Sequence, residues 1–262
     1  MEVIIRPNID HAVDLVVKLI VSRIKEKPDT TLGLATGRTM ERVYARLIAS
    51  GVSFAQCQTF NLDEYIGLRH ADPNSYRSYM KAHLFDHVEI NLANTHVPDG
   101  SAADLKKAAR DYESLIADAG GIDLQLLGIG YAGHIGFNEP LSSFKSRTRD
   151  KALTPTTRAQ NAEMFGGDAD NVPKRALTMG VGTILDASEL VLLATGAAKA
   201  AIVAKAVEGP ITSMVSASAI QMHPNCKVVT DEAAATELQG REYYDFVFEN
   251  EPEWKGFRCA EN

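Results

Sequence analysis

The chain has 262 residues, of which 45% are hydrophobic and 23% charged, and its formal net charge is -7. These values are typical of globular proteins and exclude a disordered, collagen-like or coiled-coil chain. The acidic balance also argues against nucleic acid or an anionic membrane as a partner, because both require a basic surface. The net charge does not exclude binding of a small anionic ligand, because a helix N-terminus and a few basic side chains can bind one locally.

The chain is predicted to form a single cytoplasmic domain over residues 1–262. Its N-terminus carries an acid at position 2 and has no cleavage-site pattern, and no apolar stretch reaches the ~18 residues that span a bilayer. No repeat or Pro/Gly/Ser-rich linker marks a domain boundary. The cysteines are widely spaced without a CxxC motif, which favours a reducing compartment and offers no zinc site: Cys57, Cys226 and Cys259.

Short apolar strands alternate with helices along the chain. Strands are predicted at residues 3–6, 31–35, 58–65, 122–130, 189–195 and 226–231. Helices are predicted from Asn8 or Asp10 to Pro28, around Val43 to Ile48, over 75–85 and 101–119, and from Gly196 to about Glu208. Wholly apolar strands in this alternation favour an α/β fold with a parallel sheet covered on both faces.

Polar loops follow four of the predicted strands. In open α/β sheets, ligands bind outside the carboxyl ends of the strands. These loops are therefore expected to gather at one site: ATGRT (35–39), NLDEY (61–65), GIGYAGH (128–134) and ATGAAK (194–199).

The loop ATGRT has the pattern of a phosphate cradle. Gly37 permits a tight turn into a helix, Thr36 and Thr39 offer hydroxyls, and the free N–H groups of the helix start point at a ligand. An ordinary strand–helix turn with a threonine cap explains the same residues. Lys199, in the similar loop ATGAAK, is either a surface lysine or a side chain that reaches back to the anion.

Two carboxylates end the strand predicted at 58–65. Asp63 and Glu64 are adjacent, and neighbouring residues of a strand face opposite ways, so only one can face a cleft. A carboxylate there can act as a general base with an adjusted pKa. The alternative is a helix cap or a turn aspartate.

The stretch GIGYAGHIGFNEP (128–140) places one histidine among four glycines. The glycines let the backbone pass close to a ligand and keep His134 out of a packed helix. Glu139, five residues later, is near enough to orient the imidazole, as acid–base histidines commonly require. A structural histidine is the alternative interpretation.

A basic cluster, SRTRDK (146–151), stands out in this acidic chain. If the segment is extended, Arg147, Arg149 and Lys151 share one face, with Ser142 close by in sequence. This pattern fits either an anion site or a solvated surface strand.

The combination FNLDEYIGL, GHIGFNEP, SRTR and ALTMGVGTILDASEL resembles the glucosamine-6-phosphate deaminases of the glucosamine/galactosamine-6-phosphate isomerase family, from about Thr31 to Asp231. DEY followed by GHIxFNEP separates these deaminases from lactonases of the same fold. The resemblance implies a modified Rossmann-like three-layer α/β/α fold and conversion of glucosamine 6-phosphate to fructose 6-phosphate and ammonia, without metal or redox cofactor. It also implies a homo-oligomer, either a trimer or a hexamer.

The resemblance also implies roles for single residues. Asp63 matches the base that moves a proton between C2 and C1 of the open-chain sugar, giving an enol intermediate that expels the amine. His134 matches the residue that assists ring opening, and Glu139 matches its partner. The positions that match phosphate-binding residues are Thr36, Gly37, Thr39 and Lys199.

The basic cluster has a counterpart as well. Ser142, Arg149 and Lys151 resemble residues of an allosteric site for N-acetylglucosamine 6-phosphate, found between the subunits of some hexameric members. Either Tyr243 or Tyr244 matches a further position of that site.

The sequence departs from the family pattern at several positions. Ala132 replaces a polar residue of the ring-opening network, Arg38 and Met40 replace a small residue and a proline of the phosphate loop, and Glu163 replaces an arginine. We expect Arg38 to supply the displaced positive charge and to pair with Glu163. A carboxylate at 163 also resembles the galactosamine-6-phosphate branch, and the losses at 132 and 163 would fit a non-catalytic sugar-phosphate sensor.

Overall fold

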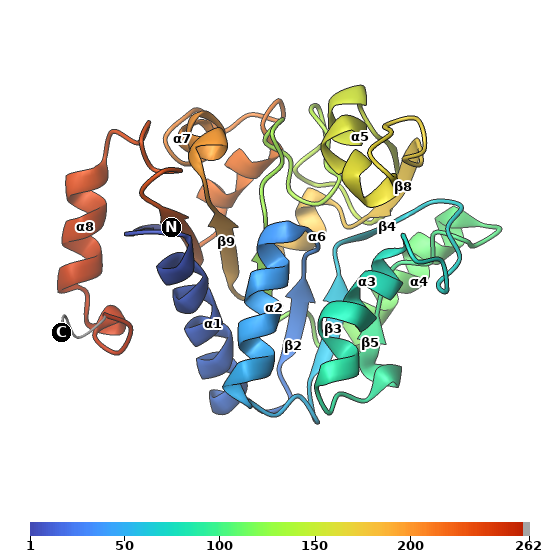
Figure 1. Cartoon of the computed structure of the whole chain (residues 1–262), viewed down its shortest axis with the longest axis horizontal. Coiled ribbons are helices and arrows are strands. Elements are labelled where there is room, and N and C mark those ends of the chain that lie inside the picture. Colours follow the sequence, from blue (N-terminus) through green and yellow to red (C-terminus); the bar gives the residue numbers. More distant parts are fainter. Residues whose placement is uncertain (259–262) are drawn as a thin grey trace.

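A computed structural model describes residues 1–258, and its centre is a seven-stranded sheet (Figure 1). The strands run in the order β1-β10-β9-β6-β2-β3-β5, and neighbouring strands are parallel throughout. Their bounds are β1 (Glu2–Arg6), β2 (Thr31–Leu34), β3 (Gln58–Asn61), β5 (Thr95–His96), β6 (Leu124–Leu127), β9 (Leu190–Ala194) and β10 (Cys226–Asp231).

Helices flank this sheet (Figure 1). They are α1 (Ile9–Glu26), α2 (Arg38–Ser50), α3 (Tyr76–His83), α4 (Leu105–Asp118), α5 (Pro155–Asn161), α6 (Val181–Leu185), α7 (Ala200–Val207) and α8 (Arg241–Asn250). Short 3₁₀ turns are η1 (Phe85–His87), η2 (Leu92–Asn94), η3 (Ala162–Phe165), η4 (Ala197–Lys199), η5 (Ser216–Met222) and η6 (Pro252–Trp254). The predicted α/β/α fold with a mostly parallel sheet is confirmed.

The central strands form because their residues are apolar on both faces. Every residue of β2, β6 and β9 is buried, as expected of parallel strands covered by helices on both sides. Helix α1 begins after Asn8, whose side chain accepts the N–H of His11, so Asn8 rather than Asp10 is its cap.

The continuous strand predicted at 58–65 is wrong, because the chain leaves the central sheet at Leu62. The Leu62 carbonyl accepts the N–H of Met179, and the next residues form β4 (Asp63–Tyr65) in a separate antiparallel sheet. That sheet has the order β4-β8-β7, with β7 at Arg149–Ala152 and β8 at Arg175–Thr178. Its partner strand lies far along the chain, so the local pattern of 58–65 could not reveal the switch.

Two of the cysteines, Cys57 and Cys226, are buried free thiols, and Cys259 lies outside the described residues. Within residues 1–258, no helix is both long enough and apolar enough to cross a membrane.

Candidate active site

A cavity of about 710 Å³ opens at the carboxyl edge of the central sheet. The loops that follow β2, β3, β6 and β9 all contribute to its lining, as the sequence predicted. Helix α3 and the segment that contains α5 and η3 complete the walls.

Asp63 and Glu64 point to opposite sides of β4. Asp63 is buried and lines the cavity. Glu64 is buried on the other side, where its carboxylate accepts the N–H of Tyr65 and those of Tyr76 and Arg77, the first two residues of α3. Glu64 therefore binds the start of α3, and Asp63 is the carboxyl group available for chemistry.

The environment of Asp63 favours the protonated acid. Burial raises its pKa to about 8, the negative charge of Glu64 adds to the rise, and the N–H of Phe137 opposes it. A carboxyl group with a pKa near the working pH can both accept and return a proton. Asp63 therefore has the properties of a proton-shuttling base at the wall of the cavity.

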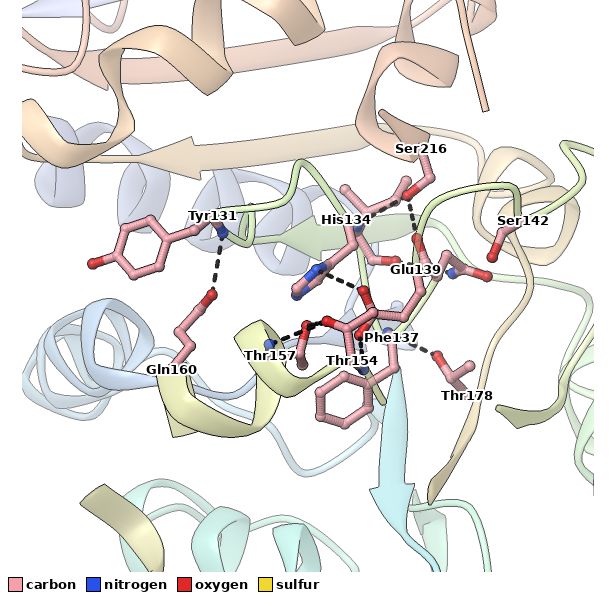
Figure 2. A network of polar contacts seen from close by, with 12 residues as sticks. Tyr131, His134, Phe137, Glu139, Ser142, Thr154, Thr157, Gln160, Thr178 and Ser216 are labelled. Carbon is pink, nitrogen blue, oxygen red and sulfur yellow. Dashed lines mark hydrogen bonds and ion pairs between the residues drawn. The ribbon is translucent and has the colours of Figure 1, made fainter. Parts of the chain in front are cut away.

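His134 and Glu139 form a buried pair (Figure 2). Like Asp63, His134 lines the cavity. The distance from His134 Nδ1 to Glu139 Oε2 is 3.7 Å, and within residues 1–258 neither atom has a hydrogen-bond partner. The other oxygen of Glu139 accepts the N–H of Thr154. Burial lowers the pKa of His134 although the charge of Glu139 opposes this, so the imidazole is neutral and able to accept a proton.

The loop that carries this pair is held by the small antiparallel sheet. The hydroxyl of Thr178 in β8 accepts the N–H of Phe137 (Figure 2). The Asn138 side-chain amide donates to the carbonyls of Ile135 and Met179. The Ser216 hydroxyl donates to the Asn138 carbonyl. Elements far apart in sequence thus fix the position of the His134 loop.

Gly130 is the residue that makes room for the imidazole. A Cβ built on Gly130 would overlap the His134 ring, whereas one on Gly128 in the same loop would meet only the end of Met40, at 3.4 Å. We expect Gly130→Ala to displace the ring and to lower kcat/KM by about 100-fold, the cost of misplacing a catalytic group by roughly 1 Å. Gly128→Ala is the control, with kcat/KM within a few fold of the wild type. Equal kinetics of the two variants, each checked for folding by circular dichroism, would contradict this prediction.

The predicted phosphate-binding residues also line the cavity: Thr36, Gly37, Arg38, Thr39 and Lys199. Gly37 precedes α2 with a φ of 119°, a value that residues with a side chain rarely adopt. Its carbonyl accepts a hydrogen bond from the Tyr79 hydroxyl at 2.9 Å. The N–H groups of Met40 and Glu41 donate to the Gly37 carbonyl, whereas those of Arg38 and Thr39, the first two residues of α2, have no carbonyl of their own helix to donate to. The turn therefore has the geometry of an anion cradle.

Lys199 reaches the cavity from the turn after β9. Its ammonium donates to the Ile129 carbonyl at 2.7 Å and lies 3.8 Å from the centre of the Tyr131 ring. Burial lowers its pKa to about 8. Lys199 is thus a positioned cation whose charge is only partly maintained in the free protein above neutral pH.

The expected pairing of Arg38 with Glu163 is confirmed. Arg38 Nη1 lies 2.8 Å from Glu163 Oε2, and both residues line the cavity. This pair connects the start of α2 to the turn η3.

The basic cluster is divided. Arg149 donates to the Ser142 hydroxyl and to the side-chain carbonyl of Asn138, and Lys151 lies two residues further along β7. Arg147 lies before β7 and pairs with Glu113 and Asp186, so the extended segment on which a shared face of all three depended does not include it. These carboxylates come from distant segments, which the local pattern does not show.

The two candidate tyrosines of α8 lie away from this cluster, because α8 packs against β1 at the edge of the central sheet (Figure 1). The Tyr244 hydroxyl donates to Glu208, and Tyr243 is exposed. Which of the two tyrosines matches the position in the allosteric site stays open.

Sequence reasoning missed the wall formed by α5. Gln160 of this helix accepts the N–H of Tyr131, which ties α5 to the His134 loop (Figure 2). The available signal was Thr154–Pro155, a capping residue followed by a proline at the first helical position. In the part of the chain that the structure describes, no group of three His, Cys, Asp or Glu side chains could hold a metal ion.

Known proteins resemble the chain over nearly its whole length. The family model described as glucosamine-6-phosphate isomerases/6-phosphogluconolactonase matches residues 7–230. A glucosamine-6-phosphate deaminase of Streptomyces coelicolor is 45% identical over 98% of this chain and 100% of its own. One of Rhodopirellula baltica is 49% identical over 92% of this chain and 97% of its own.

Solved structures agree with these relatives. A monomeric glucosamine-6-phosphate deaminase has a TM-score of 0.88 at 43% identity, covering 90% of this chain and 100% of that one. A 6-phosphogluconolactonase from Leishmania guyanensis, at 20% identity, has a TM-score of 0.71 over 89% of this chain and 97% of its own, and so shares the fold. The chain therefore belongs to the glucosamine-6-phosphate isomerase/6-phosphogluconolactonase family.

Proposed function

We propose that this protein converts glucosamine 6-phosphate to fructose 6-phosphate and ammonia, as an enzyme of amino-sugar catabolism. The observation that carries the proposal is one cavity that holds a buried carboxyl group, a neutral histidine with its own carboxylate, and a helix-start anion cradle. The names of the relatives that are 45–49% identical support glucosamine 6-phosphate as substrate and the deaminase branch over the lactonases.

The roles follow from position and charge. The start of α2, together with Lys199 and Arg38, would bind the phosphate, which leaves the sugar carbons directed toward Asp63 and His134. Neutral His134, oriented by Glu139, would take the proton of the C1 hydroxyl and assist ring opening. His134 would pass that proton to the ring oxygen as the ring opens. Asp63 would then take the proton from C2, and protonation of the aldehyde oxygen would give an enolamine. Return of the proton from Asp63 to C1 would leave an iminium at C2, to which water would add, and loss of ammonia would give the ketone of fructose 6-phosphate. Burial supports both roles, because it raises the pKa of Asp63 to about 8 and lowers the pKa of His134, which keeps the imidazole neutral.

The substrate is tested by ammonia release from glucosamine 6-phosphate and galactosamine 6-phosphate side by side. We expect kcat/KM to be higher for the glucosamine compound. A preference for galactosamine 6-phosphate would move the protein to the other branch, and no ammonia from either would favour a sugar-phosphate sensor.

A regulatory site is the second part of the proposal. Arg149 links Ser142 to Asn138, the residue before Glu139, so an anion bound at Arg149 and Lys151 would act directly on the catalytic loop. The same assay with N-acetylglucosamine 6-phosphate present tests this, and activation supports it. Assembly into a trimer or hexamer stays a prediction, since a solved relative is described as monomeric, and sedimentation measures it.

A further inference from the structure

One ion pair bridges two walls of the cavity. Arg38 is the first residue of α2, Glu163 lies in η3, and their side chains meet at 2.8 Å although they are 79% and 74% exposed. The same segment contacts the His134 loop through Gln160 and the Tyr131 N–H, at 3.1 Å. Both residues line the cavity, so a ligand bound there lies within reach of the pair.

The charges of the lining do not by themselves favour an anion. Its lysine and arginine residues are Lys199 and Arg38, and Glu41 and Glu163 bring an equal number of carboxylates, while burial favours the protonated form of Asp63. Lys199 already donates to the Ile129 carbonyl, and burial lowers its pKa to about 8. Arg38 is thus the permanently charged cation of the lining, and it already forms an ion pair with Glu163.

The ion pair between Arg38 and Glu163 is weaker than the contact that Arg38 can make with a phosphate group. Exposed ion pairs contribute little net free energy, because water solvates both partners and two side chains must be held still. Arginine binds a phosphate group through two parallel hydrogen bonds, which is a stronger and better oriented contact. A phosphate that reaches the start of α2 would therefore compete successfully for Arg38.

We propose that Glu163 is a built-in competitor of the substrate's phosphate group: it neutralises Arg38 in the empty cavity, and a bound phosphate displaces it. This rests on the proposed function only in taking the ligand to be a phosphorylated sugar. Arg38 is then a phosphate-binding residue, and Glu163 raises the Kd of the cavity for phosphate.

The experiment measures binding of inorganic phosphate by calorimetry, without turnover. Glu163→Gln removes the competitor, so the Kd for phosphate should fall about two- to fivefold, the scale of an exposed ion pair. Arg38→Glu should raise the Kd by at least about tenfold, as expected for loss of a charge-assisted contact. The double variant Arg38→Glu/Glu163→Arg puts a guanidinium at the same meeting point and should restore the Kd to within a few fold of the wild type.

The control is Asp111→Asn, which makes the same charge change in another exposed ion pair, with Lys107 on α4, outside the cavity lining. Its Kd should equal that of the wild type. The proposal is overturned if Glu163→Gln leaves phosphate binding unchanged or weakens it, if Asp111→Asn gains as much, or if the double variant binds as weakly as Arg38→Glu. Ammonia release by the wild type is scored separately, so failure of the proposed function would be seen independently of the phosphate result.

Discussion

Replacing Asp63 by asparagine is expected to lower kcat by at least about 100-fold, the usual scale for loss of a general base. The asparagine has nearly the same shape and lines the cavity in the same way, so KM should stay within a few fold. Glu64→Gln is the matched control, because this neighbouring carboxyl group faces away and binds the start of α3. That variant should lose thermal stability and keep most of its kcat. Near-normal turnover by Asp63→Asn would remove Asp63 from the mechanism.

The same variant should be more stable than the wild type at alkaline pH. In the folded protein the pKa of Asp63 is raised from 3.8 to about 8, so the folded state holds a proton that the unfolded chain has lost. Stability attributable to Asp63 is therefore complete below about pH 4, falls as pH rises, and is lost above about pH 8. Asparagine does not titrate, so the Tm of Asp63→Asn should exceed that of the wild type more at pH 9 than at pH 4. A Tm difference that does not depend on pH would contradict this.

Replacing His134 by glutamine is expected to lower kcat/KM for the cyclic sugar by about 100-fold, because glutamine cannot accept the proton of the C1 hydroxyl. A substrate analogue methylated on its ring-forming hydroxyls is always open, and on it the variant should approach the wild-type rate. Glu139→Gln should show a smaller loss, since it removes only the orienting charge 3.7 Å away. If the variant His134→Gln is equally slow on the open analogue, its role lies after ring opening.

The sequence predicted most of the parallel sheet because the signal there is local. The ranges 189–195 and 122–130 are mostly apolar and followed or closed by glycine, and they contain β9 (Leu190–Ala194) and β6 (Leu124–Leu127), the latter shorter than predicted because the chain turns into a loop after Leu127. The small antiparallel sheet was not predicted, because β7 reads RDKA and β4 is three residues long. These strands are defined by pairing with β8, which lies far from β4 in sequence, and local periodicity carries no such information.

The sequence predicted which residues form the candidate site, but not most of the contacts between them. Asp63, His134 and Lys199 follow apolar strands, and the topology of a parallel sheet brings the ends of such strands to one edge. The choice between Asp63 and Glu64 needed the structure, because it depends on where α3 begins. The partners of Arg147 and the contact of Gln160 with Tyr131 also arise from folding of distant segments.

The most direct test of the proposed chemistry is to quantify ammonia and fructose 6-phosphate together, from glucosamine 6-phosphate, with the wild type and with Asp63→Asn. We expect equal amounts of both products from the wild type and at least about 100-fold slower formation of both by the variant. Ammonia without fructose 6-phosphate, or equal rates for the two proteins, would contradict it.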